Sequence, residues 1–405
     1  MGGFALNYRH PFHFFVVLTA CLVSADAVAQ SNETLDPSLA KEPLRFTSQP
    51  YLQSPLPDSI TVMWLTNKPC LGWVEFGEGD ALDRKAMGSH FGLIDAGEDL
   101  WKIGLTGLKP GTKYSYRIMA KEIERFRPYE VVYGATIEGE THHFTTPGPN
   151  YDSVSFVVFN DVHSSKKLRS MLFPVAKKEP FDIAFLNGDI MTTVSERDIL
   201  VNQMAIPFAE LCEGEIPFVL VRGNHEARGY YARRLIDFVA TPNEQYCFSF
   251  DRGPAHFVVL DSGEDKTDSS KEYGGLADFH AYRDEETEWL KGEVESEAFK
   301  KAAFRVGFMH MPMFQSGDGP EDCTSKWAPL LNAGKLDVLI CGHLHRHEIV
   351  EPVAGQHDYP IVIGGGSEAE NATVIRAKAT PDRLEIAILD ANGQTLMERA
   401  INRRE

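Results

Sequence analysis

Short, nearly continuous apolar runs recur through the second part of this chain and constrain its fold more than any other feature. They are Val154–Phe159, Ile183–Leu186, Ile216–Val221, Phe257–Leu260, Phe304–Met309 and Leu336–Cys341. A strand in a sheet covered on both faces needs such a run, because neither of its faces meets water. The segment Glu285–Phe299, rich in Glu and Lys, is expected to be a helix. The pattern predicts an α/β domain over residues 151–405.

Polar side chains of the kind that bind metals follow five of these runs. They are Asp161 and His163, Asp189, Asn224, His310, and His343 with His345. In α/β sheets, ligands bind beyond the carboxyl ends of the strands, so we expect these distant side chains to converge. Gly188, Gly223 and Gly342 precede three of them and allow tight turns that bring ligands together. In a strand, His343 and His345 would point their rings the same way.

The types of these side chains indicate a chemistry. Imidazole and mixed oxygen ligands suit zinc, iron or manganese better than calcium or magnesium. Two such ions about 3.5–4 Å apart can hold the attacking and leaving oxygens of a displacement, with Asp189 as the bridging carboxylate. Each motif alone is more often structural, and a lone His310 is more often a core histidine than a ligand. Their order, each at a strand end, favours a metal centre. The loop Tyr273–His280 is expected to rim the pocket, with His280 more readily a solvated histidine than a substrate contact.

The segment before Thr146 has the alternation of half-buried strands. Ile60, Val62 and Trp64 share one face of a predicted strand, Trp73–Phe76 alternates separately, and Tyr114, Tyr116 and Ile118 alternate again. Short strands between turn residues predict an all-β sandwich over residues 44–147, followed by the linker 147–150. The Tyr114 hydroxyl is expected to tie its strand to the preceding turn.

Residues 1–29 have the pattern of an export signal peptide. Arg9 and His10 precede the apolar stretch Phe12–Val23, and Ala27-Val28-Ala29 forms a cleavage site. The stretch is too short for a membrane span, which needs about 20 residues. The residues 18–21 also match a bacterial lipobox, which would place a lipid anchor on Cys21. Because the residues after Cys21 stay apolar, soluble export is favoured over lipid anchoring.

The net charge limits the kinds of partner that the chain can bind, and the cysteine content limits its disulfides and structural zinc sites. Lys and Arg total 40 against 58 Asp and Glu, a net charge of −18, which argues against binding to a nucleic-acid scaffold. A phosphorylated small molecule remains compatible, because bound metal ions can outweigh the carboxylates locally. The five cysteines after residue 29 are too few for a disulfide scaffold, and none has the CxxC spacing of a structural zinc site.

The ordered set Asp-x-His, Gly-Asp, Gly-Asn-His-Glu, His and Gly-His-x-His resembles the calcineurin-like metallophosphoesterases. The segments Gln49–Leu52, Leu105–Arg117 and Phe144–Pro147, with Trp64, resemble the fibronectin type III-like module at the N-terminus of purple acid phosphatases. The resemblance implies a C-terminal four-layer α/β sandwich and a purple acid phosphatase-like enzyme with two metal ions.

The resemblance also implies roles for individual residues. One metal ion would be held by Asp161, His163, Asp189 and His345, and the other by Asp189, Asn224, His310 and His343. His225 would act as general acid or as a donor to phosphoryl oxygens, Glu226 would orient a neighbour, and a metal-bound hydroxide would be the nucleophile. His163 and Thr192 depart from true purple acid phosphatases, which carry Gly and an iron-binding Tyr there. The purple colour and the metal identity (iron, zinc or manganese) therefore do not transfer.

Three functions fit these observations. The leading hypothesis is an exported phosphomonoesterase that hydrolyses organic phosphates. A phosphodiesterase acting on nucleotides or lipid headgroups would use the same ligands. A non-catalytic surface-binding protein, with the sandwich as its working part, is disfavoured by the intact ligand set. The sequence does not determine the oligomeric state.

Overall fold

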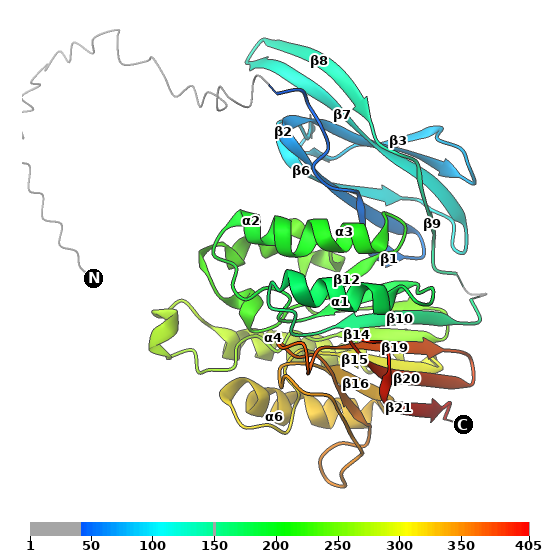
Figure 1. The fold of residues 1–405 in the computed structure, drawn as a ribbon, viewed down its shortest axis with the longest axis vertical. Coiled ribbons are helices and arrows are strands. Elements are labelled where there is room, and N and C mark those ends of the chain that lie inside the picture. The colour runs from blue at the N-terminus through cyan, green and yellow to red at the C-terminus, as the bar shows by residue number, and fades with distance from the viewer. Residues whose placement is uncertain (1–41, 149–150, 405) are drawn as a thin grey trace, which may run out of the picture. The chain divides into compact units, whose positions relative to one another are not determined.

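The computed structural model describes residues 42–148 and 151–404 (Figure 1). The predicted signal peptide and Cys21 lie outside these residues. Within the described part of the chain, no helix is long and apolar enough to cross a membrane.

The N-terminal β-region consists of seven strands joined in antiparallel pairs and one separate two-stranded ribbon. The seven strands are β1 (Tyr51–Leu56), β2 (Ser59–Glu78), β3 (Arg84–Ala86), β6 (Glu98–Thr106), β7 (Lys113–Arg127), β8 (Glu130–Glu138) and β9 (His142–Thr145). The ribbon is β4 (Ser89–His90) with β5 (Leu93–Ile94).

Strand β2 differs from the prediction, because the two expected short strands at 59–64 and 73–76 are parts of one strand of 20 residues. Its first half pairs with β1 and β6, and its second half pairs with β7 and β3. The register shifts between Leu65 and Cys70, around Pro69, which has no N–H to donate to a ladder. One long strand therefore pairs with two different sets of neighbouring strands.

Both halves of β2 bury their apolar faces in one core. Val62 and Trp64 from the first half meet Val74 and Phe76 from the second, and Trp64 stacks on Trp101 with ring centroids 5.9 Å apart. The Tyr114 hydroxyl accepts a hydrogen bond from the Lys109 backbone N–H at 2.9 Å, as predicted for a tyrosine that ties a strand to the preceding turn.

Two six-stranded mixed sheets build the rest of the chain. The first, in the order β12-β11-β10-β19-β20-β21, contains β12 (Phe218–Val221), β11 (Ile183–Asn187), β10 (Val154–Phe159), β19 (Thr373–Ala379), β20 (Arg383–Asp390) and β21 (Thr395–Asn402). The second, in the order β13-β14-β15-β16-β18-β17, contains β13 (Phe248–Arg252), β14 (Ala255–Val259), β15 (Phe304–Phe308), β16 (Val338–Cys341), β18 (Ile361–Ile363) and β17 (Glu348–Val350). Every predicted apolar run contributes a strand, and these strands pair in parallel within each sheet.

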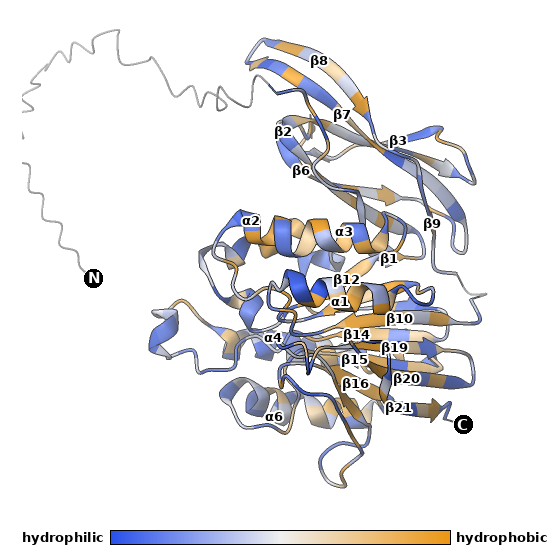
Figure 2. Ribbon diagram, in the orientation of Figure 1, coloured by the Kyte–Doolittle hydropathy of each residue, from blue (hydrophilic) through white to orange (hydrophobic). Residues whose placement is uncertain are grey.

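The two sheets face each other across an aromatic core. Phe156 and Phe185 of the first sheet pack against Phe257 and Phe308 of the second, and Phe185 stacks on Phe308 with centroids 3.9 Å apart. Figure 2 shows the apolar character of these strands. Because each inner face is dry, the strands carry the continuous apolar runs seen in the sequence.

Helices pack on the outer faces of the sheets. Helices α1 (Lys166–Ala176) and α3 (Ile206–Cys212) share a core with the first sheet, and α4 (Phe279–Glu293) and α6 (Asp318–Ala333) share one with the second. The helix predicted at 285–299 has the wrong limits. It begins earlier as α4, and a separate helix α5 (Glu297–Lys301) follows, because the Ser296 side chain accepts from the Phe299 N–H and starts a new helix.

The β-region contacts the α/β part beside the strand that leads to Asn224. The Gln53 side-chain amide donates to the Phe218 carbonyl at 2.8 Å, and the Tyr51 ring stacks on Phe218 with centroids 5.3 Å apart. The Tyr51 hydroxyl also donates to the Phe238 carbonyl at 3.1 Å. These contacts brace β12 from the side of the β-region.

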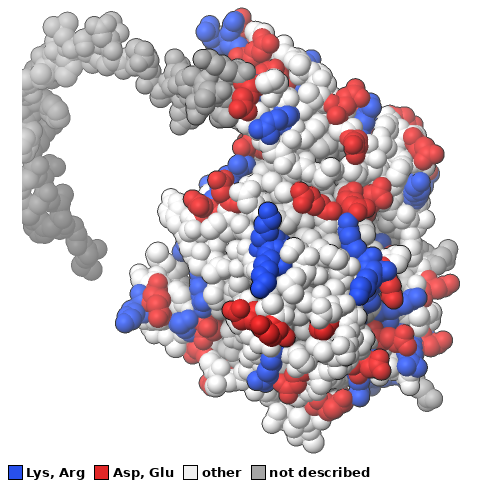
Figure 3. Space-filling view, in the orientation of Figure 1, with Lys and Arg blue, Asp and Glu red and all other residues white. Residues whose placement is uncertain are grey.

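Acidic and basic side chains are interspersed over the face seen in Figure 3. Lys109 with Glu78 and Arg117 with Glu75 are examples of pairs between them. The expectation that the chain does not bind a nucleic-acid scaffold rests on the net charge of −18 and stays a prediction.

Candidate metal centre

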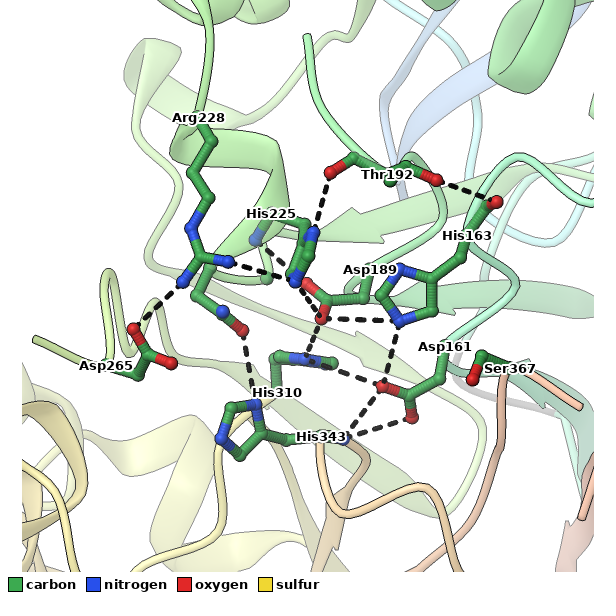
Figure 4. A network of polar contacts seen from close by, with 12 residues as sticks. Asp161, His163, Asp189, Thr192, His225, Arg228, Asp265, His310, His343 and Ser367 are labelled. Carbon is green, nitrogen blue, oxygen red and sulfur yellow. Dashed lines mark hydrogen bonds and ion pairs between the residues drawn. The ribbon is translucent and has the colours of Figure 1, made fainter. Parts of the chain in front are cut away.

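The seven predicted ligands lie together beyond the carboxyl ends of β10, β11, β12, β15 and β16 (Figure 4). Their ligand atoms fall into compact groups, each within 4.8 Å: Asp161 with His163 and His345, His163 with Asp189 and His225, and Asp189 with His310 and His343. Asn224 Oδ1 lies 3.2 Å from His343 Nδ1. His163 and Asp189 each belong to two groups, and of these two Asp189 is the carboxylate, which can bridge two ions.

Most of the seven ligands have a left-handed backbone. The φ angles are 54° at Asp161, 47° at His163, 53° at Asp189, 73° at His343 and 50° at His345. Non-glycine residues rarely adopt such angles, and they cluster at functional sites because the surrounding structure must hold them there. The expectation that the rings of His343 and His345 point the same way from a strand was wrong, because the backbone is left-handed at both residues. Neither lies in a strand, and their rings enter different groups.

The glycines before three ligands serve close approach more than turning. A Cβ atom on Gly188 would lie 2.2 Å from His310 Nδ1, one on Gly223 would lie 2.5 Å from the Asp189 nitrogen, and one on Gly342 would lie 2.8 Å from Asp161 Oδ2. Only Gly188 has a positive φ, of 85°. The three motifs can approach each other this closely only because Gly188, Gly223 and Gly342 have no Cβ atom.

The environment of His310 fits a cation. Its Nδ1 lies 2.9 Å from the Asn187 carbonyl, which can only accept, so Nδ1 carries a hydrogen and Nε2 presents a lone pair. Nε2 is buried, has no hydrogen-bond partner among the described residues, and lies 3.1 Å from Asp189 Oδ2. Burial opposes a charge on the ring, but Asp189 overcomes it and raises the pKa of His310 to about 10. A positive charge between Nε2 and the carboxylate, proton or metal, is therefore required.

The second group has the same character. His163 Nε2 and His345 Nε2 face each other at 3.0 Å, with Asp161 Oδ1 3.4 Å from the latter. The other nitrogen of His345 lies 3.1 Å from Ser367 Oγ, which orients the ring. Two imidazole nitrogens directed at one point beside a carboxylate match a site for a transition metal.

Glu226 orients a neighbour, as expected. Its fully buried carboxylate accepts backbone N–H bonds from Asp189 at 2.7 Å, Gly223 at 2.9 Å and Met191 at 3.0 Å. These bonds fix the turn that carries Asp189. Burial and the nearby Asp189 raise the pKa of Glu226 to about 7.

His225 stands at the edge of the cluster. Its Nδ1 lies 2.6 Å from the Thr192 carbonyl and therefore carries a hydrogen, which leaves Nε2 facing Asp189 Oδ2 at 3.8 Å. Thr192, in place of the tyrosine of purple acid phosphatases, donates through Oγ1 to the His163 carbonyl at 2.8 Å. Thr192 thus contacts both histidines directly, His225 at its ring and His163 at its backbone carbonyl.

The sequence analysis missed Arg228 and Ser367. The Arg228 guanidinium lies 3.0 Å from His225 Nε2 and donates to Glu264 at 2.6 and 2.9 Å and to Asp265 at 2.9 Å (Figure 4). Its position three residues after His225 was the available signal. His280 lies on α4 with a side chain 67% exposed, 3.1 Å from Asp322, and belongs to none of the three groups.

Comparison with known proteins agrees with this geometry. Residues 154–347 match the family model described as Calcineurin-like phosphoesterase. The chain is 25% identical to "Purple acid phosphatase 21" of Arabidopsis thaliana, over 65% of this chain and 57% of that protein. It is 24% identical to "Acid phosphatase type 7" of Mus musculus, over 66% and 59%. The chain thus spans less than two thirds of the length of these relatives.

A solved structure shows the fold. The purple acid phosphatase PPD1 from seeds of yellow lupin (Lupinus luteus) superposes with a TM-score of 0.64 at 17% identity, over 87% of this chain and 74% of that one. The β-region is included in a match of this extent. The chain therefore carries a calcineurin-like phosphoesterase domain and has the fold of the purple acid phosphatases.

Proposed function

We propose that the chain is a metal-dependent phosphomonoesterase with a binuclear centre that hydrolyses organic phosphates. The observation that carries this proposal is the pair Asp189 Oδ2 and His310 Nε2, 3.1 Å apart and buried among further ligand groups, where a metal ion can take the place of the proton between them. The similarity to acid phosphatases supports the choice of phosphate esters as substrates.

The proposed ligands of one ion are Asp161, His163, Asp189 and His345, and those of the other are Asp189, Asn224, His310 and His343. When bound, two ions stabilise charge on a phosphoryl group and make water a nucleophile near neutral pH. Asp189 and Asp161 supply the negative charge that retains the ions, and Glu226 and Asn187 hold Asp189 and His310 in place.

His225 is the proposed general acid. Because the Thr192 carbonyl fixes the hydrogen on Nδ1, only Nε2 is available to hold and deliver a proton to the leaving oxygen. Arg228 Nη1 donates to that nitrogen at 3.0 Å in this structure, so Nε2 takes up the proton that it delivers only when this bond opens.

Hydrolysis of p-nitrophenyl phosphate against bis(p-nitrophenyl) phosphate tests the proposed activity. We expect the purified protein to cleave the monoester preferentially, to lose activity on chelation, and to regain it with zinc, manganese or iron. Preferred cleavage of the diester would replace the proposal with a phosphodiesterase. Bound metal without cleavage of either ester would favour a surface-binding protein.

The substitution His225→Ala is expected to lower turnover by about 10²–10⁴-fold, the range for loss of a general acid. Metal content should stay at the wild-type level, because His225 is not among the proposed ligands. His280→Ala is the matched control, since that histidine lies on α4 beside Asp322, and its turnover should not change. Loss of both ions from His225→Ala would contradict the assignment.

The domain organisation completes the proposal. Residues 44–147 are proposed to be a fibronectin type III-like domain, supported by the core that both halves of β2 share and by the Tyr114 hydrogen bond. Residues 151–405 are proposed to be the catalytic domain. Export with removal of residues 1–29 is supported by the sequence pattern. The N-terminal sequence of the mature protein tests it, and a lipid on an N-terminal Cys21 would establish the anchored alternative.

A further inference from the structure

A cavity of about 720 Å³ adjoins His225 through Arg228. It lies between the helical turns at Tyr230–Phe238 and the loop at 271–279, and the walls used below are Arg228, Tyr230, Tyr273, Leu276 and Phe279. Small-molecule sites commonly enclose about 300–1,000 Å³, so this volume suits part of a substrate.

The cavity and the candidate metal centre are linked by Arg228. His225 Nε2 has Asp189 Oδ2 at 3.8 Å and Arg228 Nη1 at 3.0 Å, and Figure 4 shows the ring between these two residues. Arg228 is also a wall of the cavity. If the phosphoryl group lies at Asp189 and His225 protonates the leaving oxygen, the rest of the leaving group must extend towards Arg228.

The inner wall is fixed by one carboxylate. Glu264 accepts two hydrogen bonds from the Arg228 guanidinium and one from the Tyr273 hydroxyl, the last at 2.6 Å. The buried Arg283 holds the backbone of this segment, with bonds to the Ser262 carbonyl at 3.0 and 2.8 Å and to the Glu264 carbonyl at 2.6 Å. The cavity wall and His225 are therefore parts of one rigid network.

The remaining walls combine aromatic and aliphatic side chains with the charged residues Arg222, Arg233, Lys266 and Glu272. Tyr230 is 89% exposed and Leu276 is 75% exposed, although both are large apolar residues, and both line this one cavity. Three of the charged walls are paired with carboxylates: Arg228 binds Glu264 and Asp265, Lys266 lies 2.9 Å from Asp265, and Arg222 lies 2.6 Å from Asp261. Apolar surface gathered beside convergent polar groups is typical of a ligand site.

We propose that this cavity is a leaving-group subsite for phosphate esters whose alcohol carries an aromatic ring. The inference rests on the proposed phosphatase activity and adds its substrate class. Tyr230 and Leu276 are specificity-determining residues that contact the ring, while short polyol leaving groups such as glycerol make no use of them.

Kinetics with matched variants test the subsite. In Tyr230→Ala and Leu276→Ala, kcat/KM for 1-naphthyl phosphate should fall about tenfold each, mainly through KM, because each loses apolar contact with the ring. Glycerol 2-phosphate should change by less than about twofold. Adenosine 5′-monophosphate distinguishes a nucleoside from a simple aryl group: a parallel loss with this ester extends the subsite to nucleosides, and an unchanged rate confines it to aryl groups.

Tyr129→Ala and Leu93→Ala are the controls, because these residues are equally large and are 102% and 75% exposed in the β-region. Neither should alter any of the three rates. Equal loss on 1-naphthyl phosphate and glycerol 2-phosphate in the cavity variants, or no loss on either, would overturn the subsite.

Binding of 1-naphthylmethylphosphonate, which cannot be hydrolysed, separates this proposal from the activity itself. The metal-loaded cavity variants should bind it about tenfold more weakly than the wild type and the controls. A wild type that cleaves no ester but binds the phosphonate in a Tyr230-dependent way would refute the phosphatase and keep the subsite. A wild type that cleaves esters and binds the phosphonate independently of Tyr230 and Leu276 would keep the phosphatase and refute the subsite.

Discussion

The substitution Asp189→Asn is expected to abolish phosphate-ester hydrolysis, by a factor of about 10³ or more, while the fold remains. Asp189 is 2% exposed, and its carboxylate lies within 3.8 Å of His163, His225 and His310. Although burial opposes its charge, His310 and His225 hold the pKa of Asp189 well below its ordinary value. An amide of the same shape removes the carboxylate charge that two of the ligand groups share.

Metal analysis and thermal unfolding should accompany the rate. We expect Asp189→Asn to bind less metal than the wild type, because an amide is a weaker ligand than a carboxylate and has no negative charge to attract the two ions. The backbone bond from the residue 189 nitrogen to Glu226 does not involve the side chain, so the turn should persist.

A second buried aspartate provides the control for this substitution. Asp337 is 1% exposed and pairs with Arg305 at 3.1 Å and Arg404 at 3.2 Å, outside the ligand groups. Asp337→Asn should lower the unfolding temperature and leave turnover of the folded protein unchanged. Full activity in Asp189→Asn would refute the proposed bridge.

The architecture around these residues could be predicted because it follows from local patterns. A strand between two dry layers must be apolar along its whole length, so Val154–Phe159 and Phe304–Met309 could be recognised as strands without a structure. The convergence of Asp161, Asp189 and Asn224 followed from the rule that parallel strands of one sheet present their carboxyl ends at one edge. Their meeting with His345, which follows a strand of the other sheet, depends on how the two sheets pack.

Features that depend on tertiary contacts could not be predicted. The sequence around 59–78 contains turn-like residues, and only the shared core makes β2 continuous. The left-handed backbone at His343 depends on its N–H donating to Asp161 at 3.0 Å, a contact between distant residues. Arg228 is positioned by Glu264, 36 residues away, so its place three residues after His225 indicates nearness to the site but not its orientation.

Beneath the ligands, Glu226→Gln is expected to cost about 2–3 kcal/mol of folding free energy, although it replaces a side chain by its closest isostere. Both oxygens of Glu226 accept N–H bonds, from Asp189 and Gly223 on one oxygen and from Met191 on the other. Glutamine has one acceptor oxygen, so its NH₂ must face at least one of these N–H groups. A buried donor without a partner costs about 1–3 kcal/mol.

The same substitution should weaken metal binding by about 10–100-fold, the range for loss of a residue that orients a ligand. The turn that carries Asp189 loses a backbone anchor, either at Met191 or at Asp189 itself together with Gly223. Metal titration followed by thermal unfolding of the apo and metal-loaded protein measures both effects.

Glu286→Gln distinguishes this mechanism from the general effect of altering a buried glutamate. Glu286 is 1% exposed, and burial together with Asp261 raises its pKa well above the ordinary value. One of its oxygens accepts from the Asp261 N–H at 2.8 Å and the other has no partner among the described residues, so an amide replaces it at a cost of under about 1 kcal/mol. If the two variants lose equal stability, or if Glu226→Gln keeps wild-type metal affinity, the three N–H bonds do not hold Asp189 in place.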